Sequence, residues 1–228
     1  MKKASTPTGL GFMVFLRLIA GVAIIGMIFF FTAGTIRYWQ AWLYMAVLFI
    51  PMTIYAIYLL NKQQTVLKRR MDLKEKENQQ KWIIVLSTLS ILAIFLIPGF
   101  DKRLGWSNIS VWISILANFF VFVGYMFFIL TVRTNEFAAR TVSVEEGQKV
   151  ISSGVYAIVR HPMYLAMTII FLFTPFALGS YVAVLPALVF PFILVLRLLN
   201  EEKKLVKELD GYEEYCKKVK YRLIPGVW

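Results

Sequence analysis

The side chains best suited to chemistry stand in two short clusters, one on either side of a long apolar stretch. The first holds Arg160-His161-Pro162 and Tyr164, and the second holds Arg197, Glu201 and Glu202. A histidine and a tyrosine at the start of a helix could line a pocket for a polar ligand. Arg197 and Glu201 stand four residues apart, so they share one face of a helix. An interfacial ion pair and a belt of aromatic side chains would explain the same residues without any reaction.

The apolar stretch between the two clusters must position them. Residues 162–179 and 181–200 are both apolar, are separated only at Gly179-Ser180, and contain three prolines in their interiors. We predict a tight, kinked helical hairpin, because proline removes a backbone hydrogen bond but is tolerated in packed membrane helices. The two open ends of a hairpin are adjacent, so His161 should face Arg197, Glu201 and Glu202. This end of the hairpin is the candidate site.

The rest of the chain also has the composition of a membrane protein. It has 228 residues, of which 59% are hydrophobic and 17% charged, whereas soluble domains carry about 25% charged residues. Besides the hairpin, four apolar segments are long enough to cross a bilayer: Phe12 to Ala33, Trp39 to Leu60, Trp82 to Gly99 and Val111 to Val132. We therefore predict an all-α, polytopic transmembrane bundle of about six membrane segments. Residues 1–132 would form a four-helix transmembrane region, and residues 133–228 the region that carries the site.

The tail beyond the hairpin alternates apolar and charged residues at helical spacing. This pattern predicts a C-terminal interfacial helix between Lys203 and Lys220, interrupted at Gly211. Residues 221–228 are too apolar for a loose end, and we expect them to fold back over the site.

The positive charges indicate an orientation. The net charge is +12, and most lysines and arginines fall in alternate loops, which places both termini of a multi-pass protein in the cytoplasm. The lipid bilayer is then a partner. We expect no nucleic acid, because the aromatic residues lie in apolar spans or at their ends. We expect no metal, because the chain has one cysteine and one histidine.

An ordered series of short motifs runs through the last part of the chain. They are Gly154-Val155-Tyr156, Arg160-His161-Pro162 with Tyr164, Glu201-Glu202, Gly211-Tyr212-Glu213-Glu214-Tyr215 and Arg222-Leu223-Ile224-Pro225-Gly226. Together they resemble the isoprenylcysteine carboxyl methyltransferase family and its prokaryotic relatives, which are similar to phospholipid methyltransferases. The resemblance covers roughly Asn135 to Trp228, and its prokaryotic members imply a location in a prokaryotic plasma membrane.

This resemblance implies an integral membrane methyltransferase that uses S-adenosylmethionine and acts on a lipophilic acceptor, a carboxylate as in isoprenylcysteine O-methylation. The family's substrate-binding arginine falls on Leu198, one residue from Arg197, and Arg197 and Glu201 are taken as the catalytic pair. Arginine can orient a carboxylate through two hydrogen bonds. The residues expected to bind the cofactor are Gln148, Lys149, Val150, Ile151, Tyr156, His161, Pro162, Met163, Tyr164 and Glu202.

Three other functions remain open. A phospholipid-type N-methyltransferase would need a base, which His161, Glu201 or Glu202 could supply. A membrane reductase of the sterol type would use NADPH and would need additional arginines for its phosphates. A non-catalytic membrane protein would use the polar cluster only as an interface.

Overall fold

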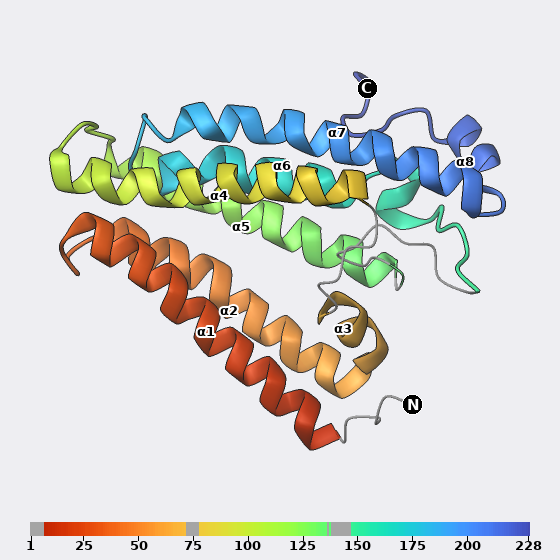
Figure 1. The fold of residues 1–228 in the computed structure, drawn as a ribbon, viewed down its shortest axis with the longest axis horizontal. Helices are drawn as coiled ribbons and strands as arrows, with labels where there is room; N and C mark the ends of the chain where they lie inside the picture. The colour runs from red at the N-terminus through yellow and green to blue at the C-terminus, as the bar shows by residue number, and fades with distance from the viewer. Residues whose placement is uncertain (1–6, 72–77, 136, 138–146) are drawn as a thin grey trace.

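The computed structural model describes residues 7–71, 78–135, 137 and 147–228, and its secondary structure over these ranges is entirely helical (Figure 1). The all-α prediction is therefore confirmed. The elements are α1 (Pro7–Ala33), α2 (Trp39–Lys62), α3 (Gln64–Met71), α4 (Asn78–Leu104), α5 (Val111–Thr134), the 3₁₀ turn η1 (Gly154–Ala157), α6 (Pro162–Ala177), α7 (Val184–Glu208) and α8 (Tyr212–Lys218).

Five of these helices are long and apolar enough to cross a membrane, namely α1, α2, α4, α5 and α7. Large apolar side chains such as Phe31 (87% exposed) and Trp112 (78% exposed) point away from the protein, as expected where lipid surrounds it. The sixth predicted segment is α6, which is apolar but has only 16 residues. At 1.5 Å per residue it is about 24 Å long, shorter than a hydrocarbon core of roughly 30 Å. The chain is a multi-pass helical membrane protein.

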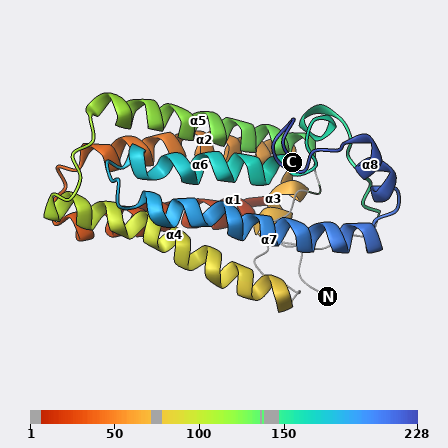
Figure 2. The ribbon, with the colours of Figure 1, turned by 90° about the horizontal axis from the view of Figure 1, so that it is seen from above.

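The helices pack as a bundle in which α6 lies between α5 and α7, while α4 packs against α7 and α1 (Figures 1 and 2). Helix α2 completes the bundle against α1 and α5. Close approach depends on small residues, as is common between membrane helices. A Cβ added to Gly99 of α4 would lie 1.7 Å from the Thr32 hydroxyl oxygen of α1, and one added to Gly124 of α5 would lie 3.0 Å from Ile170 of α6.

The turn between α6 and α7 is firmly held, with Ser180 and Ala183 buried and Tyr181 and Val182 exposed. Asp101 of α4, 1% exposed, accepts hydrogen bonds from the Ser107 amide (2.7 Å), the Ser107 hydroxyl (2.6 Å) and the Ser180 hydroxyl (2.5 Å). Gly179 in this turn has φ +82°, a conformation that favours glycine. Irregular backbone at membrane depth must be enclosed by protein. The closed end of the hairpin therefore provides a rigid support for the open end.

The tail departs from the predicted boundaries. Helix α7 does not end near Asn200 but continues to Glu208, so both acidic residues of the doublet stand on one continuous helix. The predicted C-terminal helix is present as α8, which has seven residues and starts after Gly211 (φ +82°). Four buried residues, Leu209, Tyr212, Tyr215 and Val219, pack together and set this shorter boundary. The division into regions 1–132 and 133–228 stays a prediction.

Candidate functional site

The C-terminal tail runs beside the segment that leads into α6. The Arg160 amide donates a hydrogen bond to the Tyr221 carbonyl, and the His161 amide donates one to the Arg222 carbonyl, both at 2.9 Å. Pro162 then begins α6, where its missing N–H leaves no bond unmade. The tail thus folds back over the open end of the hairpin. Its backbone hydrogen bonds hold the backbone of Arg160 and His161 in place, and so position their side chains.

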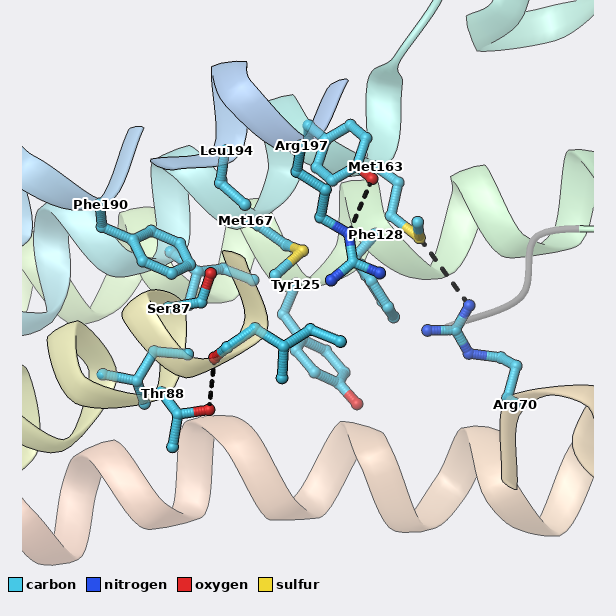
Figure 3. A pocket seen from close by; sticks show the side chains of 14 residues that line it. Arg70, Ser87, Thr88, Tyr125, Phe128, Met163, Met167, Phe190, Leu194 and Arg197 are labelled. Carbon is cyan, nitrogen blue, oxygen red and sulfur yellow. Dashed lines mark hydrogen bonds between the residues drawn. The ribbon is translucent and has the colours of Figure 1, made fainter. Parts of the chain in front are cut away.

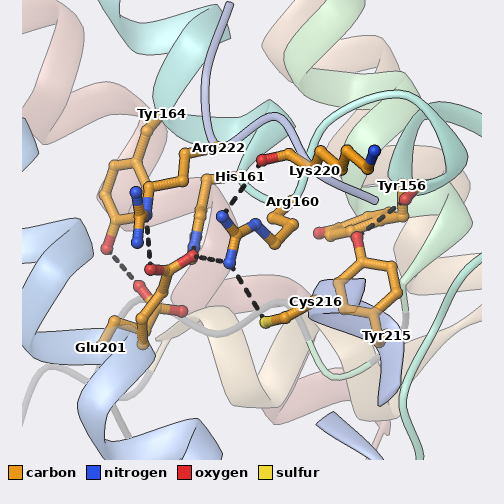
Figure 4. A network of polar contacts seen from close by, with 10 residues as sticks. Tyr156, Arg160, His161, Tyr164, Glu201, Tyr215, Cys216, Lys220 and Arg222 are labelled. Atoms are coloured by element: carbon orange, nitrogen blue, oxygen red, sulfur yellow. Dashed lines mark hydrogen bonds and ion pairs between the residues drawn. The ribbon is translucent and has the colours of Figure 1, made fainter. Parts of the chain in front are cut away.

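Glu202 of α7 is the centre of an ionic network at this end. Figure 4 shows its partners Arg160, His161 and Arg222 side by side. One carboxylate oxygen lies 2.9 Å from Nη1 of Arg160 and 3.3 Å from Nε2 of His161, and the other lies 2.7 Å from Nε of Arg222. Glu202 is only 7% exposed, so burial strengthens these attractions and makes the loss of any partner costly. Nε of Arg160 is buried and has no hydrogen-bond partner within the described part of the chain. The network joins α6, α7 and the tail.

Tyr164 forms a second, adjacent arrangement. Its hydroxyl donates a hydrogen bond to Glu201 at 2.5 Å and accepts one from Nε of Arg197 at 3.1 Å. The structure thus brings both predicted catalytic residues to one phenol oxygen. A cation beside that oxygen favours its negative form, and a carboxylate on its proton can receive or return that proton.

A cavity of about 380 Å³ opens beside Tyr164 (Figure 3). Such a volume lies within the usual range for small-molecule sites. The wall is mainly apolar and comes from α4, α5, α6 and α7, with Arg70 of α3 added. It consists of Arg70, Ile84, Ser87, Thr88, Ile91, Tyr125, Phe128, Met163, Tyr164, Met167, Ile170, Phe190, Leu194 and Arg197. The cavity therefore suits a lipophilic molecule whose polar or reacting end faces Tyr164.

Tyr156 and Tyr215, which lie outside the membrane helices, support the site through their contacts. Burial, partly offset by a hydrogen bond with Asn135, raises the pKa of Tyr156 to about 12. Burial also raises the pKa of Tyr215 above its ordinary value, and the Tyr215 hydroxyl donates a 2.7 Å hydrogen bond to the Tyr156 carbonyl. These contacts tie η1 to α8.

The other residues predicted to bind a cofactor lie less centrally. Met163 lines the cavity, and its sulfur lies 3.9 Å from Nη1 of Arg70. Within residues 148–151, Lys149 is exposed, whereas Val150 packs against the buried cluster beside α8. The structure brings His161, Tyr164 and Glu202 together, whereas residues 148–151 do not line the cavity and Val150 lies beside α8. What each predicted residue binds or does stays a prediction.

Several residues of the site were not among those predicted. Arg222 and Arg160 were visible as parts of motifs, but sequence alone did not show that both bind Glu202. Leu198, the position of the arginine expected from the resemblance, is fully buried in an apolar cluster with Ile94 and Phe190. Arg70 was counted only among the positive charges that indicate the orientation in the membrane, and no local pattern placed it at the cavity.

Comparison with known proteins identifies the family. Residues 87–228 match the model of the Ergosterol biosynthesis ERG4/ERG24 family. The chain belongs to the ERG4/ERG24 family. The match runs from Ser87 in α4 to the end of the tail and so contains most of the cavity wall and the whole Glu202 network. A similar protein is the mouse (Mus musculus) Delta(14)-sterol reductase TM7SF2, with 33% identity over 91 residues. The alignment covers 39% of this chain and 22% of the mouse protein, so the chain spans about a fifth of that relative.

Membership of the ERG4/ERG24 family overturns the resemblance to isoprenylcysteine carboxyl methyltransferases, and with it the S-adenosylmethionine cofactor and the methyltransferase activity. The comparisons favour the sterol-type reductase that the sequence left open. The physical reason for the error is that the motifs are built around mutual contacts. Arg160, His161, Glu202 and Arg222 bind one another and hold the hairpin to the tail, a task that does not depend on which cofactor lies nearby.

The described residues, 7–71, 78–135, 137 and 147–228, hold no group of three or more histidine, cysteine or acidic side chains placed to bind a metal ion.

Proposed function

We propose that this ERG4/ERG24 family protein is a membrane reductase that uses NADPH to saturate a carbon–carbon double bond in a sterol-like lipid. The family and the name of the mouse relative support the class of reaction. The mainly apolar cavity among α4, α5, α6 and α7 supports a lipophilic substrate. Such a substrate would enter sideways from the bilayer, while a water-soluble cofactor would come from the cytoplasm. The predicted location in a prokaryotic plasma membrane, with both termini cytoplasmic, is part of this proposal.

The observation that carries the proposal is that Tyr164 belongs both to the apolar cavity wall and to the polar network. Its ring is part of the cavity wall, and its hydroxyl bonds to Glu201 and Arg197. Reduction of a double bond adds one hydride and one proton, so a proton donor must stand where an apolar substrate meets a polar group. Tyr164 occupies such a boundary.

The cationic side chains at this end fit a nicotinamide dinucleotide phosphate. Arg70 contacts Met163, Arg197 contacts Tyr164, and Arg160 and Arg222 contact Glu202, so four guanidinium groups gather at the open end of the hairpin. These guanidinium groups, together with Nε of Arg160, which has no hydrogen-bond partner in the described residues, suit phosphate oxygens, which arginine binds in pairs. Bound there, NADPH would supply the hydride that a substrate carbon receives.

The residues around Tyr164 would supply the proton. Tyr164 transfers its phenolic proton to one carbon of the double bond, and the hydride adds to the other carbon. Arg197 then stabilises the phenolate through its Nε donor, and Glu201 returns a proton taken from water. The balance is one double bond, one proton and NADPH giving a saturated carbon pair and NADP⁺. A positioned acid of this kind contributes roughly 10² to 10⁴ in rate.

The test uses the full chain in detergent micelles or lipid discs. Calorimetry should show NADPH binding, and incubation with NADPH and a sterol carrying a Δ14 double bond should give a product two mass units heavier, with NADPH consumed in equal amount. Binding of S-adenosylhomocysteine without binding of NADPH would overturn the proposal. So would NADPH binding with no reduction of any sterol in a panel of double-bond positions.

A further inference from the structure

Three hydroxyl side chains lie close together on α4, and one of them differs from the others. The Thr88 hydroxyl donates a hydrogen bond to the Ile84 carbonyl at 2.8 Å, and the Ser90 hydroxyl donates one to the Pro186 carbonyl at 3.0 Å. The Ser87 hydroxyl oxygen is buried, and it has no hydrogen-bond partner in the part of the chain that the structure describes. Ser87 also belongs to the cavity wall.

An unpartnered buried hydroxyl has a cost, which a ligand can remove. Leaving such a group without a hydrogen bond costs about 1–3 kcal/mol. A serine within a helix ordinarily bonds to the carbonyl four residues earlier, as Thr88 does here. Ser87 instead faces a cavity whose other nearby side chains, Phe190 and Ile91, are apolar. Its hydroxyl is therefore placed to meet an oxygen atom of whatever fills the cavity.

The position of Ser87 sets the orientation of that molecule. Figure 3 shows Ser87 with Phe190 at one end of the cavity, and Arg197, Met163 and Arg70 at the other. Phe190 and Arg197 are seven residues apart on α7, which corresponds to about 10 Å along the helix. A rigid fused-ring lipid can bridge such a span. One end would then lie beside Tyr164 and the other beside Ser87.

We propose that Ser87 recognises a hydroxyl or carbonyl oxygen on the substrate, at the end remote from the double bond that is reduced. The substrate class is thus a rigid, lipophilic molecule with a hydroxyl or carbonyl oxygen at the end that lies beside Ser87 and Phe190. This inference rests on the proposed function and specifies which end of the lipid faces the reacting groups.

The test compares two saturated lipids that cannot react, cholestanol and cholestane, which differ only in the hydroxyl group. Each competes with radiolabelled cholestanol for the full-length protein in detergent micelles. On the unaltered protein cholestanol should bind more tightly, and Ser87→Ala should reduce this preference roughly 5- to 20-fold, as expected for one hydrogen bond. Ser90→Ala is the matched control, because the Ser90 hydroxyl is already bonded to the Pro186 carbonyl and Ser90 is not part of the cavity wall, so this variant should keep the preference.

Stability gives a second readout that does not depend on a ligand. Removing a hydroxyl that has no partner should leave the melting temperature of the lipid-free protein unchanged or raise it. A clear fall in melting temperature, with the cholestanol preference intact, would show that Ser87 bonds within the protein and would overturn the inference. If both lipids bind equally well to the unaltered protein, only the role of Ser87 fails. If neither lipid binds, the lipid cavity fails and the proposed function fails with it.

Discussion

A buried carboxylate lies at each end of the α6–α7 hairpin, Asp101 of α4 at the closed end and Glu202 of α7 at the open end, and the two have very different partners. At the closed end, Asp101 accepts hydrogen bonds from the amide and hydroxyl groups of Ser107 and Ser180. At the open end, Glu202 binds two arginines and a histidine, and beside it Glu201 bonds to a tyrosine of the cavity wall. Neutral donors suffice to hold a turn in place. The open end instead gathers charged side chains beside a cavity, and the proposed NADPH site was placed there for that reason.

The largest effect should come from Glu202→Gln. The change removes the charge that neutralises Arg160 and Arg222, and breaking a buried ion pair typically costs about 3–5 kcal/mol. Chemical denaturation should show this loss, and calorimetry should show at least a tenfold fall in NADPH affinity, because the same arginines lose their positions. An unchanged NADPH affinity in a folded variant would mean that the network is only structural.

Asp101→Asn should affect only the closed end of the hairpin. The variant weakens hydrogen bonds from Ser107 and Ser180, with an expected loss of about 1–3 kcal/mol. NADPH affinity and turnover should stay within twofold of the unaltered protein, measured below the melting temperature. Should NADPH binding fall as far as in Glu202→Gln, the contrast between the two carboxylates would be lost.

Arg197→Lys should affect the reaction more than the fold. Lysine keeps the charge but loses the planar donor group that reaches the Tyr164 hydroxyl. We expect kcat to fall roughly 10- to 100-fold, and the free energy of unfolding to change by about 1 kcal/mol or less. Steady-state kinetics and thermal melting on one preparation would check both. A variant with full kcat would exclude Arg197 from the reaction.

Cys216→Ser should have the smallest effect. The thiol sulfur lies 3.1 Å from Nη1 of Arg160, and a serine hydroxyl can accept the same hydrogen bond. A change within about 0.5 kcal/mol is expected for such a substitution, with activity retained. Inactivation would instead show that the sulfur itself takes part.

Much of the fold could be predicted from the sequence, because the bilayer imposes simple rules. Apolar length alone located α1, α2, α4 and α5, and the closely spaced segments after His161 predicted the hairpin. Helix ends were harder to predict. The extension of α7 to Glu208 and the short α8 depend on packing against Val150 and neighbouring tail residues, which are far away in sequence.

The site could be predicted only in part, for the same reason. Hairpin geometry brings His161 near Glu202 whatever the rest of the chain does. Ser87 reaches the cavity because α4 packs against α6 and α7, and Arg70 reaches it from α3, which packs beside α2 and α5. No local pattern in the sequence encodes this packing. The reaction was inferred wrongly because short motifs that build an ion-pair network look alike whatever cofactor lies beside them.

The central claim is that Tyr164 joins the polar network to the lipid cavity as the proton donor. The most direct measurement is turnover by Tyr164→Phe, which removes one hydroxyl and keeps the ring in the wall, with Tyr181→Phe in the exposed turn as control. The account predicts a fall in kcat of roughly 10² to 10⁴ with NADPH and sterol affinities within a few fold. A Tyr164→Phe protein that reduces its substrate at the normal rate would contradict it.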